Sequence, residues 1–334
     1  LDNGDFDRYE ECEELVKQAI SVGAEKDEGV DIFHAIEDVL SEDFRSPIAT
    51  GLTGIDNLMG GGLSKGELGV ILAAFGVGKT TIMTRMANTA YLMGKNVVQI
   101  FFEDNVKVIQ RKHFTCFTGI GLSELGDRSE EVKEALPRFQ NLENNLILKK
   151  MSSDGTTITH IKQYLRKLIS SGIKPDIVFL DYIDCVQPTK VFKDEYSGEG
   201  NVMRQFETML SELDIAGWTA VQGNRSSIGA DLVEANMMGG SIKKGQIGHF
   251  ILSVAKTLDQ KEEGRATLAI LKSRFGKDGV VFDDIVFDNG TLVIDTSESN
   301  DVTLLEHGKG LKKKDSDFIA STIQKKRSTP MNNN

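Results

Sequence analysis

A glycine-rich segment at residues 73–81, Ala-Ala-Phe-Gly-Val-Gly-Lys-Thr-Thr, has the residue types and spacing of a phosphate-binding loop. Backbone N–H groups around Gly76 to Lys79, and the positive end of a helix starting at Lys79, can bind phosphate oxygens. Lys79 can reach the β and γ phosphates, and the Thr80 hydroxyl can ligate Mg²⁺. The predicted nucleotide-binding residues are Ala74, Phe75, Gly76, Val77, Gly78, Lys79, Thr80 and Thr81. The motif therefore predicts ATP and Mg²⁺ as cofactors.

A chance match is the alternative explanation. Ala73 stands where the first glycine is usual, and with alanine allowed the pattern occurs in roughly a few per cent of chains of this length. The position of the segment argues against chance, because an apolar run of strand type precedes it and helical spacing of apolar residues follows. Ala73 needs only an ordinary strand-end conformation, so its presence changes little.

Hydrolysis of a nucleotide needs a metal-binding carboxylate and a group that orients the attacking water. Asp181 follows an apolar strand and is the predicted metal partner, although a solvated strand-end aspartate is the alternative. Glu103 follows the run VVQIFF, which we expect to form the strand beside the phosphate-loop strand, and is the predicted catalytic base. Asp104 competes with it or caps the next helix. Gln222 ends another strand and either senses the γ-phosphate or hydrogen-bonds its loop.

Strand-type runs and helical stripes alternate along most of the chain. Apolar runs at 69–75, 97–102, 176–181, 218–223, 249–255 and 266–272 alternate with helical periodicity, and residues 280–287 and 291–295 predict a hairpin around Asn289-Gly290. This order predicts the α/β class, with a mostly parallel twisted sheet, helices on both faces and a C-terminal antiparallel hairpin.

The chain has 334 residues and a net charge of −11. This charge argues against a broad basic nucleic-acid surface but leaves room for DNA in a narrow channel.

Residues 1–45 have helical periodicity (Leu15, Ile20, Ile36) and predict an arm that packs on a neighbouring subunit. Residues 46–296 are predicted to form the ATPase domain. Residues 297–334 are polar and predict a disordered tail. The acidic, polar start is not a secretory signal. It lacks an initiator Met, which indicates a fragment or a trimmed product. Scattered cysteines indicate a reducing compartment.

The motifs AAFGVGKTT, IFFED, IVFLDYID, AVQGNRS, GGSIKKG and LKSRFG follow one another over residues 48–295. In this order and spacing they resemble the C-terminal RecA-like ATPase domain of DnaB-type replicative helicases, and within that family the T-even bacteriophage type. The segment EELVKQAISVG resembles the family's linker helix, which docks on the neighbouring subunit.

The resemblance implies roles for individual residues. Lys79 and Thr80 hold phosphate and metal, Glu103 is the base, Asp181 is the metal partner, and Gln222 couples the γ-phosphate to the DNA-binding loop. Lys272 and Arg274 are two apart in the last motif and face the same side. In the family this pair reaches the γ-phosphate of the neighbouring subunit as an arginine finger; a solvated basic strand edge is the alternative.

DNA contacts are expected in two loops that the family places in its channel. Arg225, Gly240, Lys243 and Lys244 are the candidates in the first loop, and Lys190 and Lys193 in the second. For any single lysine, a solvated loop is an equal alternative. Met237 and Met238 replace a charged pair of the bacterial family, which makes the detailed contacts different here.

The resemblance implies an ATP-dependent helicase that forms a hexameric ring, translocates on single-stranded DNA and unwinds duplex DNA in the cytoplasm, or in the host-cell cytoplasm if a phage encodes it. Primase and a helicase loader are implied partners, although the N-terminal domain that binds primase in the family has no counterpart in these residues. No membrane association is expected. The alternative is a RecA- or KaiC-like ATPase that assembles on DNA or protein without unwinding it.

Overall fold

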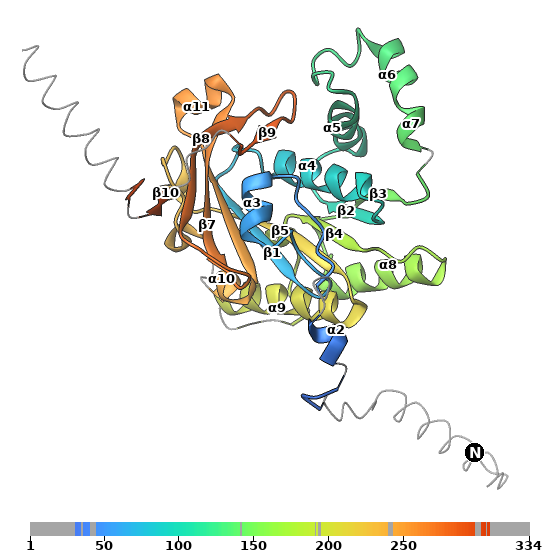
Figure 1. Cartoon of the computed structure of the whole chain (residues 1–334), viewed down its shortest axis with the longest axis vertical. Helices are drawn as coiled ribbons and strands as arrows, with labels where there is room; N and C mark the ends of the chain where they lie inside the picture. The colour runs from blue at the N-terminus through green and yellow to red at the C-terminus, as the bar shows by residue number, and fades with distance from the viewer. Residues whose placement is uncertain are drawn as a thin grey trace, which may run out of the picture. The chain divides into compact units, whose positions relative to one another are not determined.

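Figure 1 shows the protein as a computed structural model. The described residues are 31–34, 36–40, 45–140, 142–190, 192, 195–239, 243–297, 302–304 and 306–307. The chain divides into two units, residues 1–44 and 45–334. In the first unit the structure describes one short helix, α2 (Ile36–Leu40). Its apolar neighbours Ile32 and Phe33 are 84% and 76% exposed. The earlier part of the predicted arm lies outside the described residues.

Among the described residues of the second unit, ten strands form one sheet in the order β10-β8-β7-β6-β1-β5-β4-β2-β3, with β9 paired to β8. The strands from β6 to β3 in this order are parallel, and β7, β8, β9 and β10 are antiparallel. The strand bounds are β1 (Leu68–Ala73), β2 (Val97–Phe101), β3 (Leu146–Lys150), β4 (Ile177–Asp181), β5 (Ala216–Gln222), β6 (Phe250–Ala255), β7 (Arg265–Ser273), β8 (Val280–Phe287), β9 (Ile294–Asp295) and β10 (Val302–Thr303). The predicted fold class is confirmed.

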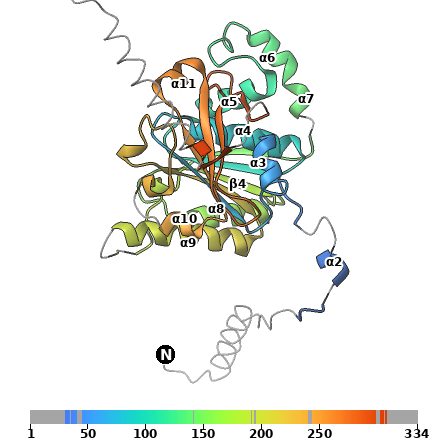
Figure 2. The ribbon, with the colours of Figure 1, turned by 60° about the vertical axis from the view of Figure 1, so that its left-hand side comes forward.

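Helices cover both faces of the sheet (Figures 1 and 2). Their bounds are α3 (Thr53–Leu58), α4 (Lys79–Leu92), α5 (Val106–Thr118), α6 (Ser129–Ala135), α7 (Pro137–Gln140), α8 (Ile158–Ser170), α9 (Glu195–Leu213), α10 (Lys243–Ile247) and α11 (Leu258–Glu263), with 3₁₀ turns at η1 (Ile183–Cys185), η2 (Arg225–Ser227) and η3 (Ala235–Met237). α3 and α4 pack on one face, and α8 and α9 pack on the other. Within the described ranges, no helix combines the length and the apolar content that a membrane crossing requires.

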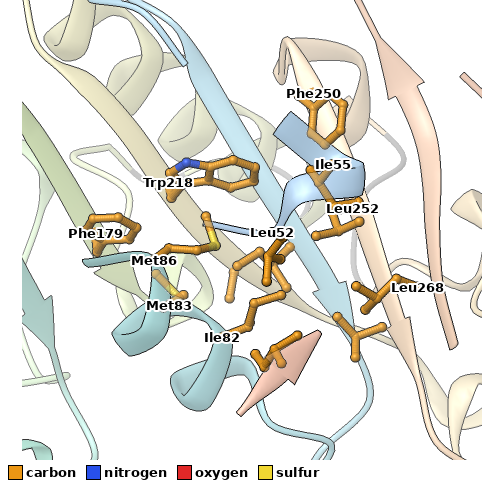
Figure 3. Packing of buried hydrophobic residues seen from close by; sticks show 14 of the residues in the cluster. Leu52, Ile55, Ile82, Met83, Met86, Phe179, Trp218, Phe250, Leu252 and Leu268 are labelled. Carbon is orange, nitrogen blue, oxygen red and sulfur yellow. The ribbon is translucent and has the colours of Figure 1, made fainter. Parts of the chain in front are cut away.

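The side-chain alternation of the strands fills two separate cores. In β1, Ile71 and Ala73 join α3 and α4 in one core, whereas Val70 and Leu72 join α8 and α9 in the other, as expected when successive side chains point to opposite faces. Trp218 of β5 lies against α4 in the first core (Figure 3). This double burial explains why the strands read as continuous apolar runs in the sequence.

Two expectations about strand neighbours and boundaries need correction. The strand that precedes Glu103, β2, is not beside β1, because β5 and β4 lie between them. The segment 297–334, predicted to be a disordered tail, contributes a strand to the sheet: β10 pairs with β8, and His307 is only 7% exposed. The apolar content of this segment was too small to reveal a two-residue strand. The predicted hairpin is confirmed, with Phe287 opposite Ile294, although β9 is short.

Candidate active site

The predicted phosphate-binding loop connects β1 to α4. β1 ends at Ala73 and α4 begins at Lys79. Gly76 and Gly78 have φ angles of 72° and 124°, which side chains with a Cβ rarely adopt. A Cβ on Gly78 would also lie 2.8 Å from the Phe287 ring. The two glycines therefore permit the tight loop that brings the backbone to the amino end of α4, where phosphate binds in proteins.

The other residues of the loop divide into anchors and exposed groups. Ala74 and Val77 are each 1% exposed and hold the loop in the core, whereas Phe75 at its tip is 74% exposed. Thr81 is 4% exposed, so it can offer phosphate a backbone N–H but not a free hydroxyl. The side chains available at the site are therefore those of Lys79 and Thr80.

The Lys79 ammonium lies among carbonyl and carboxylate oxygens. Its Nζ donates to the carbonyl of Ala74 at 3.3 Å and lies 3.5 Å from that of Ala73. Burial lowers the pKa of Lys79, and the negative charges of Asp181, Asp184 and Glu103 act in the opposite direction. Because the hydrogen-bond acceptors of Lys79 are neutral carbonyls, the charge of this partly buried cation stays available to the negative oxygens of a phosphate.

Asp181 and Thr80 bring two oxygen donors together next to this lysine. Asp181 ends β4 and is 7% exposed. Burial raises its pKa, while a hydrogen bond from the Thr80 side chain and the charges of Lys112 and Lys79 partly offset that rise. A hydroxyl and a carboxylate at this position are the hard oxygen ligands that Mg²⁺ uses in P-loop proteins. The two residues fit a magnesium ion held between the protein and phosphate.

Glu103 reaches the same site although its strand is not next to β1. Helix α4 crosses the face of the sheet and packs on β4 and β2. The amino end of α4 and the carboxyl ends of these strands therefore lie together along one edge of the sheet, meaning the edge formed by the ends of the strands. Glu103 is exposed, and its Oε1 accepts a 3.1 Å hydrogen bond from the Tyr182 hydroxyl. Burial raises the pKa of Tyr182, so the hydroxyl keeps its proton at neutral pH and can hold the Glu103 carboxylate.

Asp104 is engaged elsewhere. Its carboxylate forms an ion pair with Lys112 at 3.4 Å. The N-cap of α5 is Asn105, whose side chain accepts from the Lys107 N–H at 3.0 Å, so the helix-cap alternative for Asp104 is wrong. The capping residue comes one position later because α5 starts one residue later than the pattern indicated. Glu103 is therefore the freer of the two neighbouring carboxylates.

Gln222 is the last residue of β5, beside the last residue of β1. It pairs with Ala73 in the parallel ladder. Its N–H donates to Asp184 Oδ2 at 2.9 Å, and its carbonyl accepts from the Gly239 N–H at 2.8 Å. The backbone of Gln222 is thus held on both sides, next to the phosphate loop. This position suits a residue that links the nucleotide to the segment around Gly239.

Lys272 and Arg274 lie at the opposite edge of the sheet from the phosphate loop, which is the edge formed by the amino ends of the parallel strands. Arg274 donates its N–H to the carbonyl of His249, and the His249 N–H donates to Leu68, the first residue of β1. The phosphate loop follows the other end of β1, about 16 Å away at the usual rise per residue. An arginine side chain does not cover that distance, so Arg274 cannot complete the phosphate site of its own chain.

The segment that carries Arg274 is anchored while the arginine itself is exposed. The Arg45 guanidinium lies 4.2 Å from the centre of the Phe275 ring, and Phe275 stacks on Phe250. Lys272 donates to the carbonyls of Gly245 and Gln246 at 3.1 and 2.7 Å. Burial and the charge of Arg274 lower the pKa of Lys272. Arg274 is therefore close enough to Lys272 for its charge to act on it.

The candidate DNA-binding residues have different positions. Arg225 is exposed in η2, and Lys190 is exposed after η1. Gly240, Lys193 and the side chain of Lys243 lie outside the described residues. Lys244 is 2% exposed and forms ion pairs with Asp184 and Glu199. The prediction that Lys244 meets DNA phosphates is therefore wrong for this arrangement, because its charge is already neutralised inside the protein.

Two residues of this site were not singled out from the sequence. Tyr182 and Asp184 come one and three residues after Asp181, and the structure places both among the groups that face Lys79 or Gln222. The position of Asp184, three residues after the strand-end Asp181, could have indicated from the sequence that its carboxylate lies near the site. The acceptor role of Asp184 toward Gln222 depends on the pairing of β4 with β5, which the sequence does not state.

The fold and this site together define a P-loop ATPase domain of the RecA-like type. Residues 47–289 match the family of DnaB-like helicase C-terminal domains, and the chain belongs to that family.

Curated relatives agree with that assignment. A replicative DNA helicase DnaB from Helicobacter pylori is 28% identical over 54% of this chain and 37% of its own length. A DnaB-like replicative helicase of Enterobacteria phage T4 is 20% identical over 66% of this chain and 49% of its own. The chain thus spans half or less of these relatives.

Two solved structures share the architecture. One is a separately solved ATPase domain, with a TM-score of 0.63 at 17% identity, covering 88% of this chain and 99% of that domain. The other is a DnaB-like replicative helicase described with its interactions with primase, with a TM-score of 0.66 at 16% identity, covering 83% of this chain and 70% of that one. At these identities the two structures support the fold.

Proposed function

We propose that this chain is the ATP-driven motor of a ring-forming replicative helicase that translocates on single-stranded DNA and unwinds duplex DNA. One observation carries the proposal: the phosphate loop and the exposed Arg274 lie at opposite edges of one sheet. Each chain therefore carries one half of a phosphoryl-transfer site, the phosphate loop, at one edge and the other half, Arg274, at the opposite edge. Successive copies that place one edge against the other complete every site, and a closed ring does this without leaving an unpaired end.

Each residue at the loop edge has a separate role in hydrolysis. The loop N–H groups and Lys79 bind the phosphates, and Thr80 and Asp181 would hold Mg²⁺, which neutralises charge on the phosphate oxygens. Glu103 accepts the proton of the attacking water and is held by the Tyr182 hydroxyl at 3.1 Å. Gln222, whose backbone is fixed beside Ala73, would respond to the γ-phosphate.

Arg274 supplies a cation from the neighbouring copy, with Lys272 beside it. Positive charge added in trans stabilises the transition state and makes hydrolysis depend on assembly. The exposed apolar residues of the first unit, Ile32, Phe33 and Leu40, fit an arm that packs on a neighbouring subunit. Six copies per ring would match the implied hexamer.

Single-stranded DNA would contact the loop that includes Arg225, Gly240 and Lys243, and the loop that includes Lys190 and Lys193. Primase and a helicase loader are the proposed protein partners; among the structural neighbours, one DnaB-like helicase is described with its interactions with primase. Replication on DNA places the activity in the cytoplasm, which is that of the host cell if a bacteriophage encodes the chain.

Mixing two inactive variants tests the shared site. Lys79→Ala removes the phosphate lysine and leaves the Arg274 edge intact, while Arg274→Ala does the reverse. Each variant alone should show no hydrolysis above background. A mixture places some intact loop edges against intact Arg274 edges, so we expect single-stranded DNA-stimulated hydrolysis to return to a measurable fraction of the wild-type rate.

Two controls make the mixing experiment decisive. A mixture of Lys79→Ala with the double variant Lys79→Ala/Arg274→Ala contains no intact loop and should stay inactive. Lack of recovery in the first mixture, with rings visible by electron microscopy, would contradict the shared site. Unwinding of a forked duplex separates the helicase from a RecA- or KaiC-like assembling ATPase, which would hydrolyse ATP without strand separation.

A further inference from the structure

Lys244 is a buried cation whose environment is built from three separate parts of the chain. It lies in α10, is 2% exposed, and faces the carboxylates of Asp184 in η1 and Glu199 in α9. Its Nζ is 2.9 Å from Glu199 Oε2. Burying a lysine costs free energy unless it is paired and hydrogen-bonded. The two carboxylates meet that requirement, so the position of α10 depends on them.

Four hydrogen bonds form a closed circuit around this lysine. Lys244 Nζ donates to Asp184 Oδ1 and, at 3.4 Å, to the Gly239 carbonyl. Asp184 Oδ2 accepts from the Gln222 N–H at 2.9 Å. The Gln222 carbonyl accepts from the Gly239 N–H at 2.8 Å. Every member of the circuit is therefore fixed by two neighbours, and none of them can shift alone.

The circuit connects directly to the phosphate loop. Gln222 pairs with Ala73 across the ladder, and the next residue, Gly223, donates its N–H to the Ala73 carbonyl at 2.9 Å. The same carbonyl lies 3.5 Å from Lys79 Nζ. Asp184 also lies close enough for its charge to act on Lys79. A movement of the segment around Gly239 is thus transmitted through short, specific contacts to the loop that binds phosphate.

On the basis of these contacts, and resting on the proposed DNA-stimulated hydrolysis, we propose that Lys244 is a positioning residue. Through Asp184 it holds the Gln222 end of β5 and the Gly239 segment in one register, so that DNA bound by the surrounding loop changes the nucleotide site. Lys244 does not touch DNA or nucleotide in this role.

Glu199 provides a matched comparison within the same cluster. It pairs with Lys244 but is not a member of the circuit, whereas Asp184 is a member. Loss of the Glu199 charge leaves the contacts to Gln222 and Gly239 in place. The proposal therefore predicts different consequences for two carboxylates that neutralise the same lysine.

The test is a titration of the full chain with oligo(dT), measuring ATP hydrolysis with Mg²⁺ at several salt concentrations. For Lys244→Met we expect the maximal DNA stimulation to fall at least about fivefold, the lower end of usual coupling between two sites. The DNA concentration that gives half-maximal stimulation, and its dependence on salt, should stay as in wild type. Glu199→Gln should keep the maximal stimulation within about twofold, as a partly exposed ion pair contributes little.

Two results would overturn the proposal. Unchanged maximal stimulation in Lys244→Met would show that the circuit transmits nothing. A higher half-maximal DNA concentration, with a salt slope smaller by about 0.7 and an unchanged maximum, would identify Lys244 as a phosphate ligand instead. Failure of the proposed function is distinguishable from both, because then the wild-type chain itself shows no stimulation by oligo(dT).

A second variant covers the case in which Lys244→Met does not fold, as judged by its circular dichroism melting curve. Asp184→Ala removes the acceptor for Gln222 and leaves Glu199 to neutralise Lys244, so no buried charge is left unpaired. It should show the same loss of maximal stimulation with the same half-maximal DNA concentration. A folded Asp184→Ala chain with wild-type stimulation would refute the proposal.

Discussion

The two edges of the central sheet are built in different ways. At the carboxyl edge of the parallel strands, a glycine loop, a buried aspartate and a partly buried lysine lie within one tightly packed site. At the other edge, Arg274 is exposed on a segment whose neighbour Phe275 is held by Arg45 at 4.2 Å. The first edge encloses the side chains that we propose bind the nucleotide; the second presents an exposed cation on an anchored segment.

This difference indicates which half of the site depends on assembly. Burial and hydrogen bonds fix the loop edge within one chain, so nucleotide binding should survive dilution of the subunits. Arg274 contacts no phosphate site in its own chain, so its contribution should vanish when the neighbour is absent. Changes at the two edges should therefore separate binding from turnover.

Arg274→Ala should give the largest separation between the two edges. We expect hydrolysis to fall by about 10³-fold or more, the usual contribution of an arginine supplied in trans, with nucleotide affinity unchanged. Steady-state hydrolysis and binding of a fluorescent ATP analogue measure the two quantities. Lys277→Ala, an exposed neighbouring cation, is the control and should change turnover by no more than about twofold. Equal losses in both variants would contradict the finger assignment.

Glu103→Gln sharpens the assignment at the loop edge. It keeps the size of the side chain and an acceptor for Tyr182 but removes the base, so turnover should fall by about 10²-fold or more. Asp104→Asn is the matched control, because Asp104 pairs with Lys112, and its loss of turnover should be much smaller. If Asp104→Asn were the more damaging change, the catalytic base would be Asp104.

Lys272→Met should have a smaller effect than Arg274→Ala. The ammonium already donates to the carbonyls of Gly245 and Gln246, and removing such charged hydrogen bonds costs about 1.5–3 kcal/mol. We expect turnover to drop about tenfold and the melting temperature to fall with it. A loss of turnover as large as that of Arg274→Ala, without a change in melting temperature, would place Lys272 on the phosphate directly.

The smallest expected effect is a pH dependence from Lys256, behind the loop edge. Its Nζ donates to the Phe287 carbonyl at 2.6 Å, and burial lowers its pKa from 10.5 to about 8. Between these values the unfolded chain holds a proton that the folded chain has lost, so the free energy of unfolding rises with pH across that window.

Melting curves of wild type and Lys256→Met measure this contribution. The melting temperature of wild type, relative to the variant, should rise by about 2 °C between about pH 7.5 and pH 9.5, corresponding to about 1 kcal/mol. The variant removes the titrating group, so the rest of the pH dependence cancels in the difference. A difference in melting temperature that stays flat or falls with pH would show that burial does not lower the pKa of Lys256.

Much of the fold followed from local patterns. The strands preceding Lys79, Glu103, Asp181 and Gln222 are buried on both faces, so they read as continuous apolar runs with chemistry at their ends. The wrong neighbour for β2 arose because periodicity reports which face a residue occupies and carries no information on strand order. The two-residue β10 was missed because its stability comes from pairing with β8, not from its own composition.

The site was predictable to the extent that its residues act through their own type. A lysine after a glycine loop predicts phosphate binding, and an acid at the end of a strand predicts a metal ligand or a base, from the motif alone. Lys244 shows the limit: as a lysine in a polar loop it indicated a DNA contact, whereas the fold places it between Asp184 and Glu199. Its role depends on which carboxylates the fold brings within hydrogen-bond distance.

The sequence alone determined the nucleotide chemistry and the α/β class, because glycine conformations, burial periodicity and side-chain reactivity are local properties of the chain. Tertiary structure decided the rest: that β5 and β4 separate β1 from β2, that Arg274 lies at the edge opposite the phosphate loop, and that Lys244 is neutralised internally. These outcomes depend on contacts between residues far apart in the chain, and the distance between two such groups is fixed only when the sheet is assembled.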